Sequence, residues 1–144
     1  MIQFIKSWHP QQFKFIKESL LNEGLSEEEI CLSKENRIFW LMIEDKEILG
    51  FCGFCDNNID YPILEYFWIA PHKRKKPKCI WINLIRFLKS LLKDIGCKNI
   101  LIDVKGNNNF EYLLSFVERI THTKAYKQIK GNSYFFVNIE EINI

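Results

Sequence analysis

The sequence predicts an α/β (α+β) fold with a mixed, mostly antiparallel sheet of about six or seven strands and helices on both faces. Three observations predict it. Apolar residues make up 47% and charged residues 26% of the 144 residues, as in globular domains with a substantial core. Segments with strand patterns outnumber amphipathic helical segments. One long helix crosses between two strands, which makes those two strands parallel. The chain is expected to form one domain over residues 1–144.

The N-terminal segments predict a strand followed by two helices. Residues 2–8 alternate apolar and polar side chains, which is typical of a strand. Pro10 opens an amphipathic helix that extends to about residue 22, and Gly24 is a plausible end. Ser26 precedes three glutamates, which predicts an N-cap and a second, short helix.

The next segments predict an antiparallel meander. Residues 37–44 are continuously apolar and aromatic in their centre, as in a strand buried on both faces. A tight turn at residues 45–46 joins them to a strand over 48–55, and the two strands form a hairpin. A third strand over 63–70 ends at Pro71.

The C-terminal half contains the clearest helix. Over residues 77–95 apolar side chains form one stripe and polar side chains the opposite face, and Pro77 suits the first turn, where its missing N–H is not needed. The crossover through this helix is expected to be right-handed. The remaining predicted elements are a strand over residues 98–104, a helix over 106–120, and a final pair of strands over 124–129 and 133–139.

The net charge of +2 conceals one concentrated positive segment at residues 72–78. Five of the 20 cations lie there without an acid, which leaves 15 cations against 18 acids, or −3, for the rest of the chain. The segment lies between a strand and a helix N-terminus, where α/β proteins bind phosphates. A nucleic-acid patch and a solvated loop are the alternatives. The five cations are Lys73, Arg74, Lys75, Lys76 and Lys78.

Five cysteines in one chain are expected to be reduced and mostly buried, because their number is odd and they lie in predicted strands and helices. Cys52 and Cys55 have CxxC spacing, but no second pair completes a zinc site, so no metal is expected. The three histidines show no ligand spacing. No apolar run is long enough to span a membrane, and a cytoplasmic location is expected.

The segment 69–74 reads Ile-Ala-Pro-His-Lys-Arg and resembles a motif of the GNAT superfamily of N-acetyltransferases, whose element order the whole chain shares. The resemblance implies acetyl-CoA as cofactor. In that family a glycine-rich loop holds the pyrophosphate through backbone N–H groups at the start of the long helix. Here Pro77 and Cys79 occupy the positions of the two glycines. The charges of neighbouring lysines are expected to replace the lost backbone contact to the pyrophosphate.

The resemblance also implies a set of site residues. Glu65 matches a position that often carries the general base, and alternation along the strand places it on the face of Phe67 and Ile69. The tyrosine that protonates the leaving thiolate is replaced by Phe116, so Tyr112 is the expected acid, with Tyr126 as an alternative. The expected cofactor-binding residues are Phe67, Ile69, Arg74, Lys75, Lys76, Lys78, Cys79 and Asn109.

Two function classes follow. The first is an acyl-CoA-dependent N-acetyltransferase acting on an amine of a small molecule or protein. The second is a GNAT-like protein without catalysis that serves in binding or structure; its last third loosely resembles GNAT-like proteins of short-tailed phages, some of which are packaged in the virion. DNA modification through residues 72–78 is a third possibility. The acceptor is expected to be set by residues 23–36 and the terminal hairpin.

Overall fold

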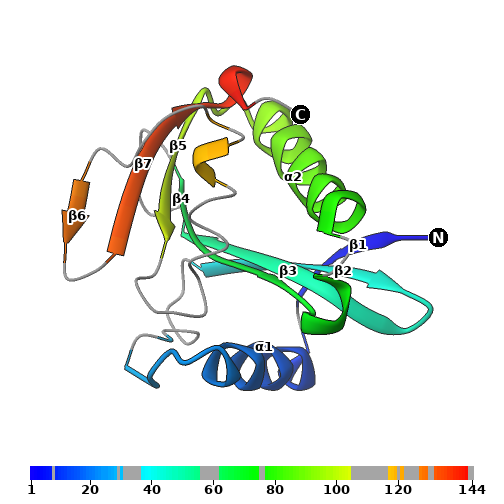
Figure 1. Ribbon diagram of the computed structural model, residues 1–144. Coiled ribbons are helices and arrows are strands. Elements are labelled where there is room, and N and C mark those ends of the chain that lie inside the picture. The colour runs from blue at the N-terminus through cyan, green and yellow to red at the C-terminus, as the bar shows by residue number, and fades with distance from the viewer. Residues whose placement is uncertain are drawn as a thin grey trace.

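The computed structural model describes residues 1–7, 9–28, 30, 37–55, 62–74, 77–104, 117–119, 121, 127–129 and 132–142 (Figure 1). Of residues 37, 77–79, 81 and 127–129 only the backbone is described. The strands are β1 (Gln3–Lys6), β2 (Arg37–Glu44), β3 (Glu47–Cys55), β4 (Ile63–Ile69), β5 (Asn99–Val104), β6 (Lys127–Ile129) and β7 (Asn132–Asn138). The helices are α1 (Pro10–Asn22) and α2 (Pro77–Asp94), with short 3-10 turns η1 (Pro71–Lys73) and η3 (Ile139–Glu141).

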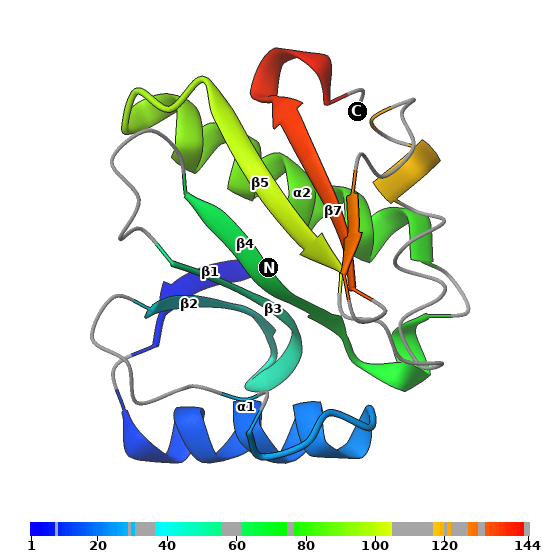
Figure 2. The same ribbon diagram turned by 90° about the vertical axis from the view of Figure 1, so that its left-hand side faces the viewer.

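The strands form one seven-stranded sheet in the order β1-β2-β3-β4-β5-β7-β6. Every neighbouring pair is antiparallel except β4 and β5, which are parallel and joined through α2. The predicted mixed, mostly antiparallel sheet and its single crossover are therefore confirmed. Figures 1 and 2 show α1 on one face of the sheet and α2 on the other.

Local sequence signals explain where the first elements begin and end. His9 caps α1: its Nδ1 accepts a hydrogen bond from the Gln11 N–H at 3.2 Å, and the Gln12 side chain accepts one from the His9 N–H at 3.1 Å. Asp45 and Lys46 have φ of 51° and 68°, the left-handed pair of a tight hairpin turn. The predicted bounds of α1 and β2 agree with the structure.

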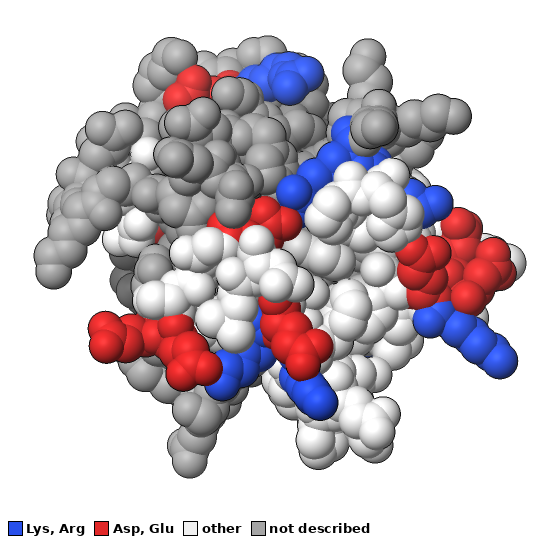
Figure 3. Space-filling model, turned by 60° about the horizontal axis from the view of Figure 1, so that its bottom comes forward, with Lys and Arg blue, Asp and Glu red and all other residues white. Residues whose placement is uncertain are grey.

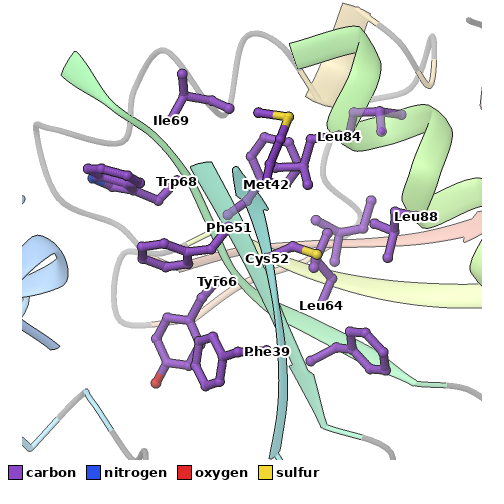
Figure 4. Close-up of a cluster of buried hydrophobic side chains, with 14 of the residues drawn as sticks. Phe39, Met42, Phe51, Cys52, Leu64, Tyr66, Trp68, Ile69, Leu84 and Leu88 are labelled. Carbon is purple, nitrogen blue, oxygen red and sulfur yellow. The ribbon is translucent and has the colours of Figure 1, made fainter. Parts of the chain in front are cut away.

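Aromatic side chains pack on the α1 face of the sheet. Phe51 stacks on Trp68 with ring centroids 5.0 Å apart, and Phe15 of α1 meets Trp68 edge-on at 5.6 Å. Phe39 stacks on Tyr66 at 5.6 Å. Such contacts add to the stabilisation from the buried area alone. Figure 4 shows these four sheet rings on one side of the strands.

Aliphatic and sulfur-containing side chains pack mainly on the α2 face. Met42, Cys52 and Leu64 lie on the side of Leu84 and Leu88 in Figure 4, and all five are buried. The apolar stripe of α2 predicted from the sequence therefore covers the sheet, as its 3.6-residue period requires.

Of the predicted second helix after Ser26, residues 27, 28 and 30 are described, and over these residues the prediction is wrong; residues 29 and 31–36 lie outside the described residues. There the chain makes a turn, with the Ile30 N–H donating to the Glu27 carbonyl at 3.2 Å. Leu25 is buried and its N–H donates to the Leu20 carbonyl at 3.2 Å, so the stretch is held to the end of α1. One helical turn gains too few hydrogen bonds to overcome this competing arrangement.

Two later predictions are tested only in part. Residues 117–119 are helical, as expected, but most of the predicted helix over 106–120 lies outside the described residues. The strand predicted over 124–129 is described only as β6, and β7 begins one residue before its predicted start.

Candidate functional site

The sheet is nearly interrupted between β4 and β5. The two strands pair at only two positions, Ile63 with Leu101 and Leu64 with Ile102. The Leu101 N–H also donates to the Pro62 carbonyl at 3.1 Å. Beyond Leu64, β4 leaves the β5 ladder, whereas β5 stays paired with β7 as far as Val104. The two halves of the sheet therefore separate along a seam.

A β-bulge in β4 lies where this separation begins. The register with β3 runs from Gly53 opposite Tyr66 to Phe54 opposite Leu64, so Glu65 is the extra residue of β4. Bulges bend a strand, re-aim a side chain and end pairing, and they are frequent beside active sites. The bulge also interrupts the period of two, so alternation alone does not fix the direction of Glu65. The predicted base thus lies at the point where β4 and β5 diverge.

A narrow pocket opens between the seam and α2. Its walls are mostly apolar, and Glu65, Lys89 and Asp103 contribute charged groups. Lys89 Nζ donates to the carbonyl of Ile142 at 3.0 Å, which holds the C-terminal segment against the pocket. Both Glu65 and Phe67 line it. The lining residues are Leu64, Glu65, Tyr66, Phe67, Ile85, Leu88, Lys89, Ile100, Ile102, Asp103, Val117 and Ile142.

The basic segment connects the end of β4 to the start of α2, where the sequence predicted it. The N–H groups of Lys73 and Arg74 donate to the carbonyls of Ala70 and Pro71, at 2.9 and 3.2 Å, and form η1. Lys75 and Lys76 lie outside the described residues, and Lys78 and Cys79 are described only as backbone of the first turn of α2. The N-terminus of α2, of which the backbone is described, attracts anions through its dipole.

Arg74 points into the protein. Its Nε donates to the carbonyl of Ile69 at 2.8 Å, and its Nη2 pairs with Oε1 of Glu23. The side chain of Glu23 is only 7% exposed, so this carboxylate is buried at the end of α1. Ile69 itself is fully buried, and it contributes its carbonyl here. Sequence reasoning missed Glu23 because no local pattern links it to a residue 51 positions later.

The remaining predicted site residues, Tyr112 and Asn109, lie outside the described residues, as do Phe116 and Tyr126. Over the described ranges, no group of three potential metal ligands occurs, and no helix is long and apolar enough to cross a membrane. On the face drawn in Figure 3, described acidic and basic side chains are intermixed rather than gathered by sign.

The CxxC pair lies within the sheet and takes no part in the pocket. Cys52 and Cys55 are both buried thiols of β3, and burial raises the pKa of Cys52 to about 12. Their spacing within β3 places them on opposite faces of the sheet. A thiol with so high a pKa is a poor nucleophile and a poor metal ligand at neutral pH.

Comparisons with solved structures identify the fold. The chain superposes on an acetyltransferase of the GNAT family from Staphylococcus aureus with a TM-score of 0.68 and 14% identity, covering 96% of this chain and 99% of the other. The PaiA N-acetyltransferase of Thermoplasma acidophilum, whose structure contains coenzyme A, gives a TM-score of 0.65 and 15% identity over the same shares. No protein-family model and no curated protein sequence matches the chain.

A protein of Desulfovibrio desulfuricans assigned to the same family gives a TM-score of 0.75 at 15% identity, over 96% of this chain and 99% of that one. These likenesses extend over nearly the whole length of both proteins. The chain therefore has the GNAT fold, and the fold predicted from its element order is confirmed.

Proposed function

We propose that the protein is an acyl-CoA-dependent N-acetyltransferase that transfers an acetyl group to an amine of a small molecule or protein. The observation that carries the proposal is the coincidence of three features at one place: the bulge at Glu65, the end of β4–β5 pairing, and a pocket between that seam and α2. The GNAT fold alone does not imply catalysis, so the proposal depends on these three features of the site.

The residues of the seam and of the basic loop fit an extended, anionic cofactor. A strand edge offers alternating donors and acceptors to an amide-bearing chain such as pantetheine. At the end of β4, the N-terminus of α2 and the cations Lys75, Lys76 and Lys78 favour a pyrophosphate. Phe67 contributes an apolar wall, and Cys79 and Asn109 remain proposed contacts.

The chemistry requires a base and an acid. We assign the base to Glu65, which takes one proton from the neutral attacking amine, directly or through water, as the nitrogen attacks. The nitrogen then bonds to the carbonyl carbon, the carbon–sulfur bond breaks, and the leaving thiolate takes a proton from Tyr112. A backbone N–H of β4 near Ile69 is proposed to polarise the carbonyl oxygen.

The proposal is tested by measuring thiol release from acetyl-CoA with a panel of primary amines and lysine-containing peptides. Glu65→Gln is expected to lower kcat by about 100-fold while the KM for acetyl-CoA changes little, because a general base contributes about 10²–10⁴ in rate. Glu44→Gln is the matched control, since this carboxylate ends β2 and pairs with the N-terminus at 3.9 Å, away from the pocket. Equal rates for wild type and Glu65→Gln would contradict the assigned role.

A second candidate function is a binding or structural protein with the GNAT fold and no catalysis, including the phage-encoded, virion-associated kind. Pro77 favours it, because proline in the first turn of α2 removes one N–H donor from the expected pyrophosphate site. Titration with coenzyme A separates the two: no binding at millimolar concentration contradicts the enzyme. A parallel titration with duplex DNA tests the nucleic-acid alternative for residues 72–78, which predicts a steep loss of affinity with salt.

A further inference from the structure

Arg74 joins three parts of the fold through one guanidinium group. Nε donates to the carbonyl of Ile69, the last residue of β4, at 2.8 Å. Nη2 pairs with the carboxylate of Glu23, the residue that caps the end of α1. Arg74 itself ends η1 and precedes the loop to α2. The end of α1, the end of β4 and the start of the cofactor loop are thereby held together.

This contact is largely shielded from water. The side chain of Glu23 is 7% exposed and that of Arg74 is 23% exposed, so neither charge is solvated as on an open surface. Glu23 is fixed in turn, because its N–H donates to the carbonyls of Ser19 and Leu20 at 3.2 and 3.1 Å. A guanidinium presents several donors in one rigid plane and can serve both partners at once, whereas an ammonium cannot hold the same geometry.

We propose that Glu23 and Arg74 form a positioning pair that sets the backbone of residues 70–74, which lead from β4 towards α2, for binding the pyrophosphate of acyl-CoA. The inference rests on the proposed function and changes the role that the sequence predicted for Arg74. The guanidinium acts on the loop from within and does not contact the cofactor. Because Glu23 ends α1, the pair also ties the cofactor loop to the segment after α1, where residues that select the acceptor are expected.

The direction in which Glu23→Gln changes the affinity for coenzyme A distinguishes this role from its alternatives. Glu23→Gln removes a negative charge near a site for a polyanion, so simple electrostatics predicts tighter binding of coenzyme A. Direct contact between Arg74 and the anion predicts the same, because the substitution releases the guanidinium from its carboxylate. A positioning pair predicts weaker binding, since the loop loses its anchor.

The experiment is a calorimetric titration of the full chain with coenzyme A. Glu23→Gln and Arg74→Lys are each expected to raise Kd by about 10-fold, because small misplacements of a binding group have large effects. Glu47→Gln is the matched control: this carboxylate pairs with His72 at 2.5 Å, at the same end of the sheet, and does not contact Arg74 in any described interaction. Its Kd is expected to stay within twofold or fall. Unchanged or tighter binding by Glu23→Gln overturns the proposal.

A second measurement keeps the pair testable if the proposed function fails. If the wild-type protein does not bind coenzyme A at millimolar concentration, the proposed acetyltransferase function is contradicted. Hydrogen exchange then still tests the positioning pair. In Glu23→Gln the amides of Lys73 and Arg74, which close η1, are then expected to exchange about 10-fold faster than in Glu47→Gln. Equal exchange in both variants shows that the pair does not position the loop. Melting curves recorded first establish that each variant is folded.

Discussion

The two halves of the sheet differ in how their strands pair and in how the helices cover them. Strands β1 to β4 form three antiparallel ladders that extend along most of each strand, with one register shift in each of the β2–β3 and β3–β4 ladders. They are enclosed by α1 on one face and α2 on the other. Strands β5, β7 and β6 pair with one another and meet β4 at only two positions. The main aromatic core and the candidate site therefore lie in different parts of the sheet. The enclosed half carries the aromatic core, and the seam beside it carries the candidate site.

The largest expected effect comes from truncating the aromatic core. Phe51 is fully buried, stacks on Trp68 and contacts the ring of Phe39 edge-on. Phe51→Ala is expected to lower the free energy of unfolding by about 3–5 kcal/mol, through lost burial and the cavity left behind. Denaturant unfolding followed by fluorescence measures it.

The matched truncation lies in the other half. Phe136 of β7 is 51% exposed, so Phe136→Ala is expected to change the free energy of unfolding by less than about 1 kcal/mol. Similar losses in the two variants would show that the halves contribute equally and would remove the distinction.

A smaller effect is expected at Gly50 of β3, which pairs with Ile69 of β4. A Cβ added there would lie 2.7 Å from the carbonyl oxygen of Trp68 and 2.9 Å from Cδ1 of Ile69. The carbonyl belongs to the backbone and cannot rotate away, so the strands must move apart. Gly50→Ala is expected to cost about 1–3 kcal/mol of unfolding free energy, as other overpacked sites do.

Gly96→Ala serves as the comparison, since nothing lies within 4 Å of an added Cβ there and only its φ of +81° opposes the substitution. Its expected cost is about 1 kcal/mol, that of a left-handed residue with a side chain. A larger loss at Gly96 than at Gly50 would mean that backbone strain outweighs the close approach of β3 and β4.

Most of the fold was predictable from local signals. The period of α2, the positive-φ turn at Asp45 and Lys46, and Pro10 at the start of α1 are determined within a few residues of sequence. The family resemblance then supplied the position of Glu65. At residues 27, 28 and 30 a turn replaces the helix predicted after Ser26, because Leu25 just before them is held to the end of α1, which the acidic run does not reveal.

The site itself was predictable only in part. The bulge at Glu65 depends on the register of β3 against β4, which no pattern within β4 reveals. The inward direction of Arg74 depends on a buried carboxylate from a distant segment, which the basic run itself does not reveal. Both features are determined by pairings between residues far apart in the sequence, and local propensity does not reveal them.

The smallest expected effect concerns two thiols, one in each region of the comparison. Cys52 lies in the enclosed half and is fully buried, whereas Cys97 precedes β5 and is half-buried. Burial raises the pKa of both thiols, that of Cys52 to about 12. Alkylation of the folded protein at pH 8, followed by peptide mass analysis, is expected to modify Cys97 well before Cys52. Faster reaction of Cys52 would show that the enclosed half opens first.

The Cys52 thiol makes the free energy of unfolding fall as the pH rises. Because the folded pKa of Cys52 lies above the ordinary value of 9.0, the folded state keeps its proton while the unfolded chain ionises. The stabilisation of the folded state by the protonated Cys52 thiol is therefore fully present below pH 9 and is lost as the pH rises from 9 towards 12. Between pH 8 and 10, Cys52→Ala is expected to lose about 1 kcal/mol less unfolding free energy than wild type, since each pH unit above the unfolded pKa is worth about 1.4 kcal/mol. Parallel losses in the two proteins would show that Cys52 titrates normally and that solvent reaches the space between β3 and α2.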